Sequence, residues 1–243
     1  RFWFQPLVEG ATSVSLSFES LSTAEGKTIE RDESIGLSIS INTVSTHSLS
    51  GKVIDGIGGG PVEGAAITAL RSLTPDQGPS FAALTGADGL FTLTDLPVGV
   101  YDLLATKTGR AGSLLSRVHV TDETGTVDIV QPEYEYAQYA TTPPTILVDG
   151  ITYGRSYGGI IPVSVRAYAG SCPVIKTDFH KSIYLKIGIT DEIYHEVESS
   201  ETDSLFYNWN TSFLPSGEAV VKIVAYDANN NRCETNIRVL VEG

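Results

Sequence analysis

A G-x-S-x-G pentapeptide at residues 154–158 is the nearest approach to a catalytic motif in the sequence. Ser156 at its centre would serve as a hydrolase nucleophile only where a strand turns sharply into a helix, because that turn exposes the hydroxyl and the helix N-terminus supports the oxyanion hole. The residues that follow, 159–165, alternate as a strand does. We therefore expect no catalytic residue here and no enzyme activity.

The four histidines lack the spacing of a metal site. His47, His119, His180 and His195 are far apart in sequence and form no H-E-x-x-H pair. His119 alternates with valines in a predicted strand, which favours a surface position over the role of a base. His180 and His195 flank another predicted strand, but the sequence supplies no third ligand beside them. We expect no metal and no other cofactor.

Three further stretches have compositions that bind ions or sugars in other proteins. The acidic residues between 191 and 203 lack the D-x-D-x-D-G spacing of a calcium loop, so we expect a solvated acidic face. The run GIGGGP at residues 56–61 is followed by no helix that could bind phosphate, so we expect a turn. Asn210 begins an N-T-S sequon and is the candidate glycosylation site.

Composition limits the classes of partner. The 243 residues include 16 Lys and Arg against 29 Asp and Glu, a net charge of −13, which opposes nucleic acid and anionic membranes as partners. No run of about 18 apolar residues is present, so no membrane span is expected. The chain starts at Arg1 and contains no Met, which indicates a processed or excised segment whose signal peptide, if any, has been removed.

Short strands with frequent turn signals predict an all-β protein with tandem β-sandwiches. The stretch 85–109 shows the pattern: Asp88-Gly89 forms a hairpin turn, and Pro97 and Gly99 mark a corner between two alternating strands. We expect about seven strands in residues 48–132 and six more in residues 143–243. Residues 133–142 form a stiff linker, and no helix of ten residues is expected.

The N-terminal segment, residues 1–47, has strand-like alternation near residues 14–18 and 35–41. Two or three strands are marginal alone, so we expect this segment to pack against the next module or another chain, or to be part of an incomplete domain completed by further sequence. Phe2, Trp3 and Phe4 form an aromatic cluster of the kind found at interfaces. One alternative is packing within the chain, and the other is insertion as an added strand into a neighbouring subunit.

The runs SGKVIDGIGGGPVEGAAITA and TGADGLFTLTDLPVGVYDL resemble the carboxypeptidase regulatory-like domain. The resemblance covers about residues 48–132 and implies a transthyretin-like Greek-key sandwich, related to collagen-adhesin B-type repeats, with no catalytic role. Some B-type repeats carry a Lys–Asn isopeptide bond. Lys52 is placed for such a bond, but the last strand, TVDIV, offers no Asn, so we do not expect it.

Residues 143–243 resemble a bacterial immunoglobulin-like domain, close to fibronectin type III. The resemblance is carried by Trp209, Thr211, Ser212, Gly217 and the run AYDANN at 225–230. By residue type alone, Cys172 and Cys233 are either buried thiols or one disulfide. The resemblance places them at the same end of the sandwich and so implies the disulfide.

These features favour a non-catalytic extracellular structural protein that serves in surface display, adhesion or assembly into a filament. The expected partners are further copies of the chain or other cell-surface proteins. The alternative is an accessory C-terminal region of a secreted hydrolase or peptidase, since regulatory-like modules also occur beside such enzymes. Carbohydrate is a third ligand class, with Trp3, Trp209 and the tyrosines as stacking surfaces, although we expect Trp209 to lie in a core.

Overall fold

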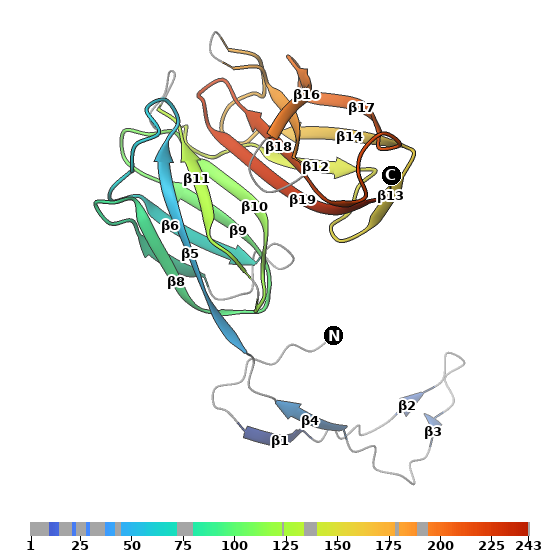
Figure 1. Cartoon of the computed structure of the whole chain (residues 1–243). Coiled ribbons are helices and arrows are strands. Elements are labelled where there is room, and N and C mark those ends of the chain that lie inside the picture. The colour runs from blue at the N-terminus through green and yellow to red at the C-terminus, as the bar shows by residue number, and fades with distance from the viewer. Residues whose placement is uncertain are drawn as a thin grey trace. The chain divides into compact units, whose positions relative to one another are not determined.

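The computed structural model divides the chain into two compact units, Arg1–Ser45 and Thr46–Gly243. It describes residues 10–14, 21–22, 28–29, 37–41, 45–71, 80–122, 124–133, 140–177, 180–188 and 194–242. All regular elements in these residues are strands, as predicted (Figure 1). The described residues include no helix of the length and apolar character needed to cross a membrane.

The described residues of the N-terminal unit form two small antiparallel pairs. Strand β1 (Gly10–Val14) pairs with β4 (Leu37–Ile41), and β2 (Leu21–Ser22) pairs with β3 (Thr28–Ile29). The second predicted strand is confirmed over 37–41, whereas the first begins earlier than expected, at Gly10. Residues 15–20 and the cluster of Phe2, Trp3 and Phe4 lie outside the described residues.

The first sandwich contains seven strands, the number predicted. A three-stranded sheet, β11-β5-β8, packs on β10-β9-β6-β7 over a core drawn from residues 49–129. Leu49, Ile67 and Leu103 are fully buried there because alternate residues of each strand point inward. The strands are β5 (Thr46–Asp55), β6 (Ala66–Arg71), β7 (Phe81–Leu84), β8 (Leu90–Pro97), β9 (Gly99–Thr106), β10 (Ser113–Val120) and β11 (Val127–Gln131).

The described residues of the second sandwich form eight strands, two more than predicted. The sheet β12-β14-β17 packs on β16-β15-β18-β19 over a core drawn from residues 148–241. The unpredicted strands are β13, which has only three residues, and β16, which is too polar to show a clear alternation. The strands are β12 (Thr145–Asp149), β13 (Ser156–Gly158), β14 (Ile160–Tyr168), β15 (Ile183–Gly188), β16 (Tyr194–Ser200), β17 (Ser204–Asn210), β18 (Gly217–Tyr226) and β19 (Arg232–Glu242).

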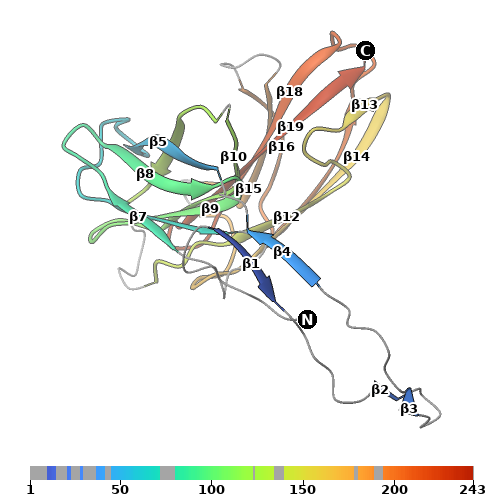
Figure 2. The same ribbon diagram turned by 90° about the horizontal axis from the view of Figure 1, so that it is seen from below.

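One nine-stranded sheet runs through both sandwiches, because β10 pairs in parallel with β19 (Figures 1 and 2). Leu115 of the first core pairs in register with Glu234, so the two side chains point to the same face. Ile237 belongs to the second core and lies three residues after Glu234, so it points to the opposite face. The two cores therefore lie on opposite faces of the shared sheet.

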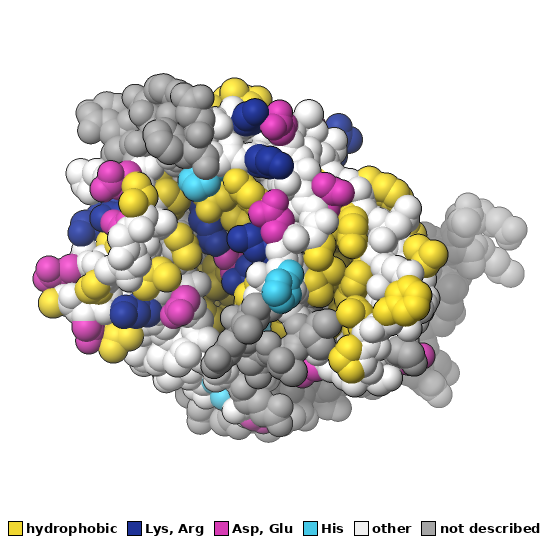
Figure 3. Space-filling view, turned by 45° about the horizontal axis from the view of Figure 1, so that its top comes forward, with side chains coloured by type: hydrophobic (Ala, Val, Ile, Leu, Met, Phe, Trp, Pro, Cys, Tyr) yellow, Lys and Arg dark blue, Asp and Glu magenta, His cyan; other side chains and the backbone are white. Residues whose placement is uncertain are grey.

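The surface of the compact unit carries side chains of every type. On the face drawn in Figure 3, apolar and charged side chains are interspersed, and Lys and Arg side chains gather in a hollow near its middle. This local excess of basic side chains contrasts with the negative net charge of the whole chain, −13.

Candidate functional site

Asn231 lies where the two sandwiches meet, and its side chain bonds to three segments. Its Oδ1 atom accepts a hydrogen bond from Gly112 N at 2.8 Å. Its Nδ2 atom donates to Ala140 O at 2.5 Å and to Asp227 Oδ2 at 2.9 Å. Arg232 N adds a bond to Gly112 O at 2.9 Å. Asn231 is fully buried, so removing its amide would leave polar atoms without partners. We call Gly112, Ala140, Asp227, Asn231, Arg232 and Glu234 the junction.

Asp227 fixes the loop that presents Asn231. Its Oδ1 atom accepts hydrogen bonds from Asn229 N at 2.9 Å and from Asn231 N at 3.0 Å. Such bonds from a carboxylate to the following backbone are the usual means by which Asp closes a tight loop. Burial raises the pKa of Asp227 above its ordinary value, although the bonds from Asn231 and Asn229 oppose this rise. The loop is therefore shaped by a carboxylate with little access to water.

Arg232 and Glu234 form a buried ion pair beside the paired segment of β10 and β19. Each is 5% exposed, and Arg232 Nη2 donates to Glu234 Oε2. Lys222 Nζ lies 3.3 Å from Glu234 Oε1, which also accepts a bond from Asn236 Nδ2 at 2.9 Å. Burial acts to raise the pKa of Glu234, but Arg232 and Lys222 outweigh it and lower the pKa. Glu234 is thus an ionised group that depends on its two cations.

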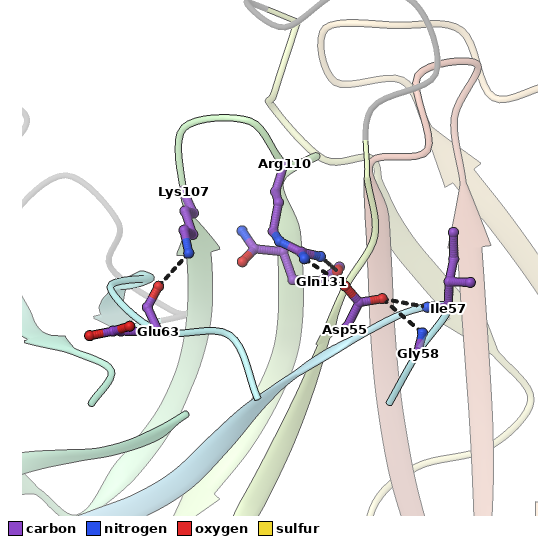
Figure 4. Close-up of polar contacts among 7 residues, drawn as sticks. All are labelled: Asp55, Ile57, Gly58, Glu63, Lys107, Arg110 and Gln131. Atoms are coloured by element: carbon purple, nitrogen blue, oxygen red, sulfur yellow. Dashed lines mark hydrogen bonds and ion pairs between the residues drawn. The ribbon is translucent and has the colours of Figure 1, made fainter. Parts of the chain in front are cut away.

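A second polar cluster closes one end of the first sandwich (Figure 4). Asp55, at the end of β5, accepts hydrogen bonds from Ile57 N at 2.7 Å, Gly58 N at 3.0 Å and Arg110 Nη2 at 2.5 Å. Arg110 Nη1 also donates to Gln131 O at 3.2 Å. The two backbone bonds, followed by Arg110, lower the pKa of Asp55 from 3.8 to about 2. Because the hydrogen bonds of Asp55 are satisfied within the protein, the cluster is typical of a structural cap rather than of a reactive site.

Asp55→Asn is expected to cost about 1–2 kcal/mol of unfolding free energy at neutral pH, because it removes the charge that these donors bind. The folded pKa of about 2 lies below the ordinary 3.8, so this stabilisation is complete above pH 3.8 and is lost as the pH falls toward 2. Urea unfolding across this range should show the difference between the two proteins shrinking. Asp149→Asn, at an exposed position of β12, is the control and should change the unfolding free energy at neutral pH only slightly. A difference between wild type and Asp55→Asn that does not change with pH would contradict this account.

The pentapeptide at residues 154–158 is followed by a strand, as the alternation of residues 159–165 predicted. Ser156 is exposed in β13, where it pairs in register with Leu240, and the strand β14 follows. The four histidines are separate: His47 lies 3.2 Å from Asp122, His119 stacks on Tyr153, and His180 stacks on Tyr226. His195 is exposed in β16 and pairs with Ile187. Among the described residues, no group of three or more His, Cys, Asp or Glu could hold a metal ion.

The other predicted positions have ordinary surroundings. Residues 56–61 form a turn, closed by a bond from Asp55 N to Gly60 O at 2.8 Å. Glu196 and Glu198 are exposed in β16, which fits a solvated acidic face, while Asp191 and Glu192 lie outside the described residues. The sequon residue Asn210 is exposed at the end of β17 and accepts a bond from the nitrogen of Ser212 at 3.1 Å, so its glycosylation stays a prediction. Trp209, 3% exposed, belongs to the second core, as predicted.

The two cysteines are free thiols in the structure, which differs from the disulfide that the immunoglobulin-like resemblance implies. Cys233 is fully buried within β19, between Ala225 and Leu114 of the neighbouring strands. Cys172 is half-buried in the loop after β14. Burial raises the pKa of Cys233 to about 12 and also raises that of Cys172. Each thiol is therefore a weak nucleophile near neutral pH.

We expect a thiol reagent such as Ellman's reagent to modify at most one cysteine of the folded chain, Cys172, and slowly. In denaturant and without reductant it should modify two, because both side chains then reach water. Cys172→Ser should abolish the reaction of the folded chain and leave one thiol in denaturant. Zero thiols in denaturant would show that the disulfide forms after all.

The comparisons with known proteins assign the first sandwich. Residues 48–131 match the carboxypeptidase regulatory-like domain. The regulatory-like match includes all seven strands of this sandwich except the first two residues of β5, and it agrees with the resemblance predicted for residues 48–132. The match does not extend to the second sandwich, so the immunoglobulin-like resemblance of residues 143–243 stays a prediction. No curated protein matches the chain.

Several solved structures match the chain at low similarity. The major pilin SpaD of Corynebacterium diphtheriae is 10% identical, with 82% of this chain and 65% of the pilin covered and a TM-score of 0.32. The major pilin BcpA of Bacillus cereus is 13% identical, with 81% and 69% covered and a TM-score of 0.28. An endo-β-1,4-mannanase of Thermotoga petrophila is 13% identical, with 53% and 30% covered and a TM-score of 0.32. The chain spans less than two thirds of SpaD and of the mannanase, and these likenesses carry no argument about function.

The junction could not be read from the sequence. No sequence motif marks Asn231, although it lies directly after the run AYDANN at 225–230. The unusual succession of Asp227 with three asparagines was the available signal, since these residue types form loops that bond to their own backbone. Its partners Gly112 and Ala140 precede it in the chain by 119 and 91 residues.

Proposed function

We propose that the chain is a non-catalytic structural module of the cell surface, in which two sandwiches act as one stiff unit for display, adhesion or filament assembly. The supporting observation is the shared nine-stranded sheet, whose β10 and β19 are held by the buried junction. A module that separates or joins other parts of a surface protein benefits from a fixed angle between its domains. The regulatory-like match of residues 48–131 also favours a non-catalytic role.

We further propose that residues 1–47 mediate self-association, with Phe2, Trp3 and Phe4 inserting beside a strand of a neighbouring copy. The support is an aromatic cluster at the start of a segment whose described strands form only two-stranded pairs. The immunoglobulin-like assignment of residues 143–243 belongs to the same proposal. It is supported by two packed sheets of the orders β12-β14-β17 and β16-β15-β18-β19.

Light scattering and negative-stain electron microscopy of the full chain test the assembly. We expect oligomers or filaments that disappear when residues 1–10 are deleted, because the aromatic cluster is then lost. The triple variant Phe2→Ser, Trp3→Ser and Phe4→Ser should have the same effect without shortening the chain. A full chain that is monomeric at all concentrations, or a deletion that changes nothing, would contradict self-association.

The regulatory-like match also supports a second role, that of an accessory region of a secreted hydrolase or peptidase. The full reading frame of the gene distinguishes the two. A peptidase domain encoded in the same frame would favour the accessory role. A signal peptide that ends directly before Arg1 would favour the structural subunit.

A further inference from the structure

A cleft of about 390 Å³ lies beside the segment where β10 and β19 pair. Its walls come from both sandwiches: His119 of β10 and Asp128 of β11 on one side, Lys222 of β18 and Asn236 of β19 on the other. The cleft follows from the shared sheet. Because the two cores lie on opposite faces, the outer face of β18 and β19 stands next to the side of the first sandwich.

Among the described residues that line the cleft, one cation has no partner. Arg117, Lys222 and Arg238 line it, against the carboxylates of Asp128 and Glu234. Lys222 lies 3.3 Å from Glu234, and Arg238 lies 2.8 Å from Glu218, which is outside the cleft lining. The guanidinium of Arg117 makes no hydrogen bond or ion pair with a described residue.

Arg117 is held in a conformation that arginine rarely adopts. Its φ is +59°, in the left-handed region, within a register shift of β10 between Leu115 and Val118. Its backbone nitrogen donates to Asp102 Oδ1 at 2.9 Å, which helps to fix the bulge. The other described non-glycine residues with positive φ are Asp95 and Asn230, types that tolerate this region. Bulges often redirect a side chain toward a binding site, and strained residues cluster at such sites.

The neutral part of the cleft favours a ring-shaped ligand. Tyr153 is 44% exposed and stacks on His119 with ring centroids 3.7 Å apart. Burial, and then Arg117, lower the pKa of His119, so its imidazole is neutral at neutral pH. His119 covers one face of the Tyr153 ring, and the opposite face of such a ring is suited to contact the apolar face of a sugar ring.

Two carboxylates in the cleft limit the charge of the ligand. Asp128 is exposed and makes no hydrogen bond or ion pair with a described residue, and Glu234 is ionised. Both repel a phosphate or sulfate dianion, whereas the exposed Asp128 also accepts hydrogen bonds from hydroxyl groups. A single carboxylate would pair with Arg117 in the two-bond geometry that guanidinium favours.

We propose that this cleft binds an acidic saccharide, a uronic-acid unit whose carboxylate pairs with Arg117 and whose hydroxyls bond to Asp128. The ring packs against Tyr153. This inference does not rest on self-association, because the cleft lies wholly within residues 115–238.

Isothermal titration calorimetry of the full chain with digalacturonate and with neutral galactobiose tests the proposal. We expect digalacturonate to bind and galactobiose to bind at least about tenfold more weakly, because a charged hydrogen-bonded pair contributes that much discrimination. Arg117→Gln should weaken digalacturonate binding at least about tenfold, while Arg155→Gln, an exposed arginine outside the cleft lining, should not change it.

Arg117→Gly separates binding from folding. It removes the guanidinium and allows the positive φ, so we expect no loss in Tm together with lost digalacturonate binding. Several results would overturn the proposal: no binding of digalacturonate, equal binding of galactobiose, binding of inorganic phosphate as tight as that of digalacturonate, or full binding by either Arg117 variant.

Discussion

Glu234→Ala is expected to lower the free energy of unfolding by about 3–5 kcal/mol, because it leaves the buried guanidinium of Arg232 without a counter-charge. Glu234 and Arg232 are each 5% exposed, so water cannot replace the missing carboxylate. Lys222 and Asn236 lose a partner as well, which removes three contacts at once. Urea unfolding, with the intrinsic fluorescence of the buried Trp209 as the signal, measures the change.

Glu218→Ala is the matched control, since it removes the same side-chain type from an exposed ion pair with an arginine of β19. Glu218 and Arg238 lie 2.8 Å apart, but their side chains are 52% and 56% exposed. Solvent screens such a pair, so we expect Glu218→Ala to lower the free energy of unfolding by less than about 1 kcal/mol. Equal losses for Glu234→Ala and Glu218→Ala would show that the buried pair does not hold the junction.

Gly112→Ala should lower the free energy of unfolding by about 2–4 kcal/mol, the second of the two largest effects that we expect. A β-carbon at Gly112 would lie 1.9 Å from Thr141 O and 3.2 Å from Pro143 Cδ. The obstacle is a backbone oxygen, so no rotamer change relieves it and the segment around Thr141 must move. That movement would strain the bonds of Gly112 to Asn231 and Arg232, so the effect should fall on the junction.

Gly60→Ala is the comparison for this substitution. Gly60 has no atom within 4 Å of an added β-carbon, and its φ is not positive. We expect its unfolding free energy to stay within about 0.5 kcal/mol of wild type. Thermal unfolding of both variants measures the difference in stability. A Gly112→Ala protein as stable as Gly60→Ala would contradict the close approach of Gly112 to the backbone of Thr141.

The first sandwich was predictable because its signals are local. Asp88-Gly89 marks a hairpin whose geometry is set by neighbouring residues, and Gly89 has φ +75° as that turn requires. The corner at Pro97 is also local, although the structure narrows the predicted break of 95–99 to the single residue Val98 between β8 and β9. Alternation then assigns the buried face of each strand.

The junction was not predictable because its bonds join distant segments. Residues of β10 pair with residues of β19 that follow them by 119 positions, and neither strand carries a mark of that pairing. Strand β16 was missed since its residues alternate weakly and its position depends on pairing with β15. The cleft beside the junction exists only once both sandwiches share a sheet, so Arg117 had no signal in the sequence.

A distance measurement between the two sandwiches tests whether they form one stiff unit. Spin labels at Leu84→Cys and Ile160→Cys, which are 70% and 67% exposed in the wild type, would mark the first and second sandwich in a Cys172→Ser background. Double electron–electron resonance should give one narrow distance distribution, which broadens in Asn231→Ala. A broad distribution in the protein with an intact junction would contradict the account.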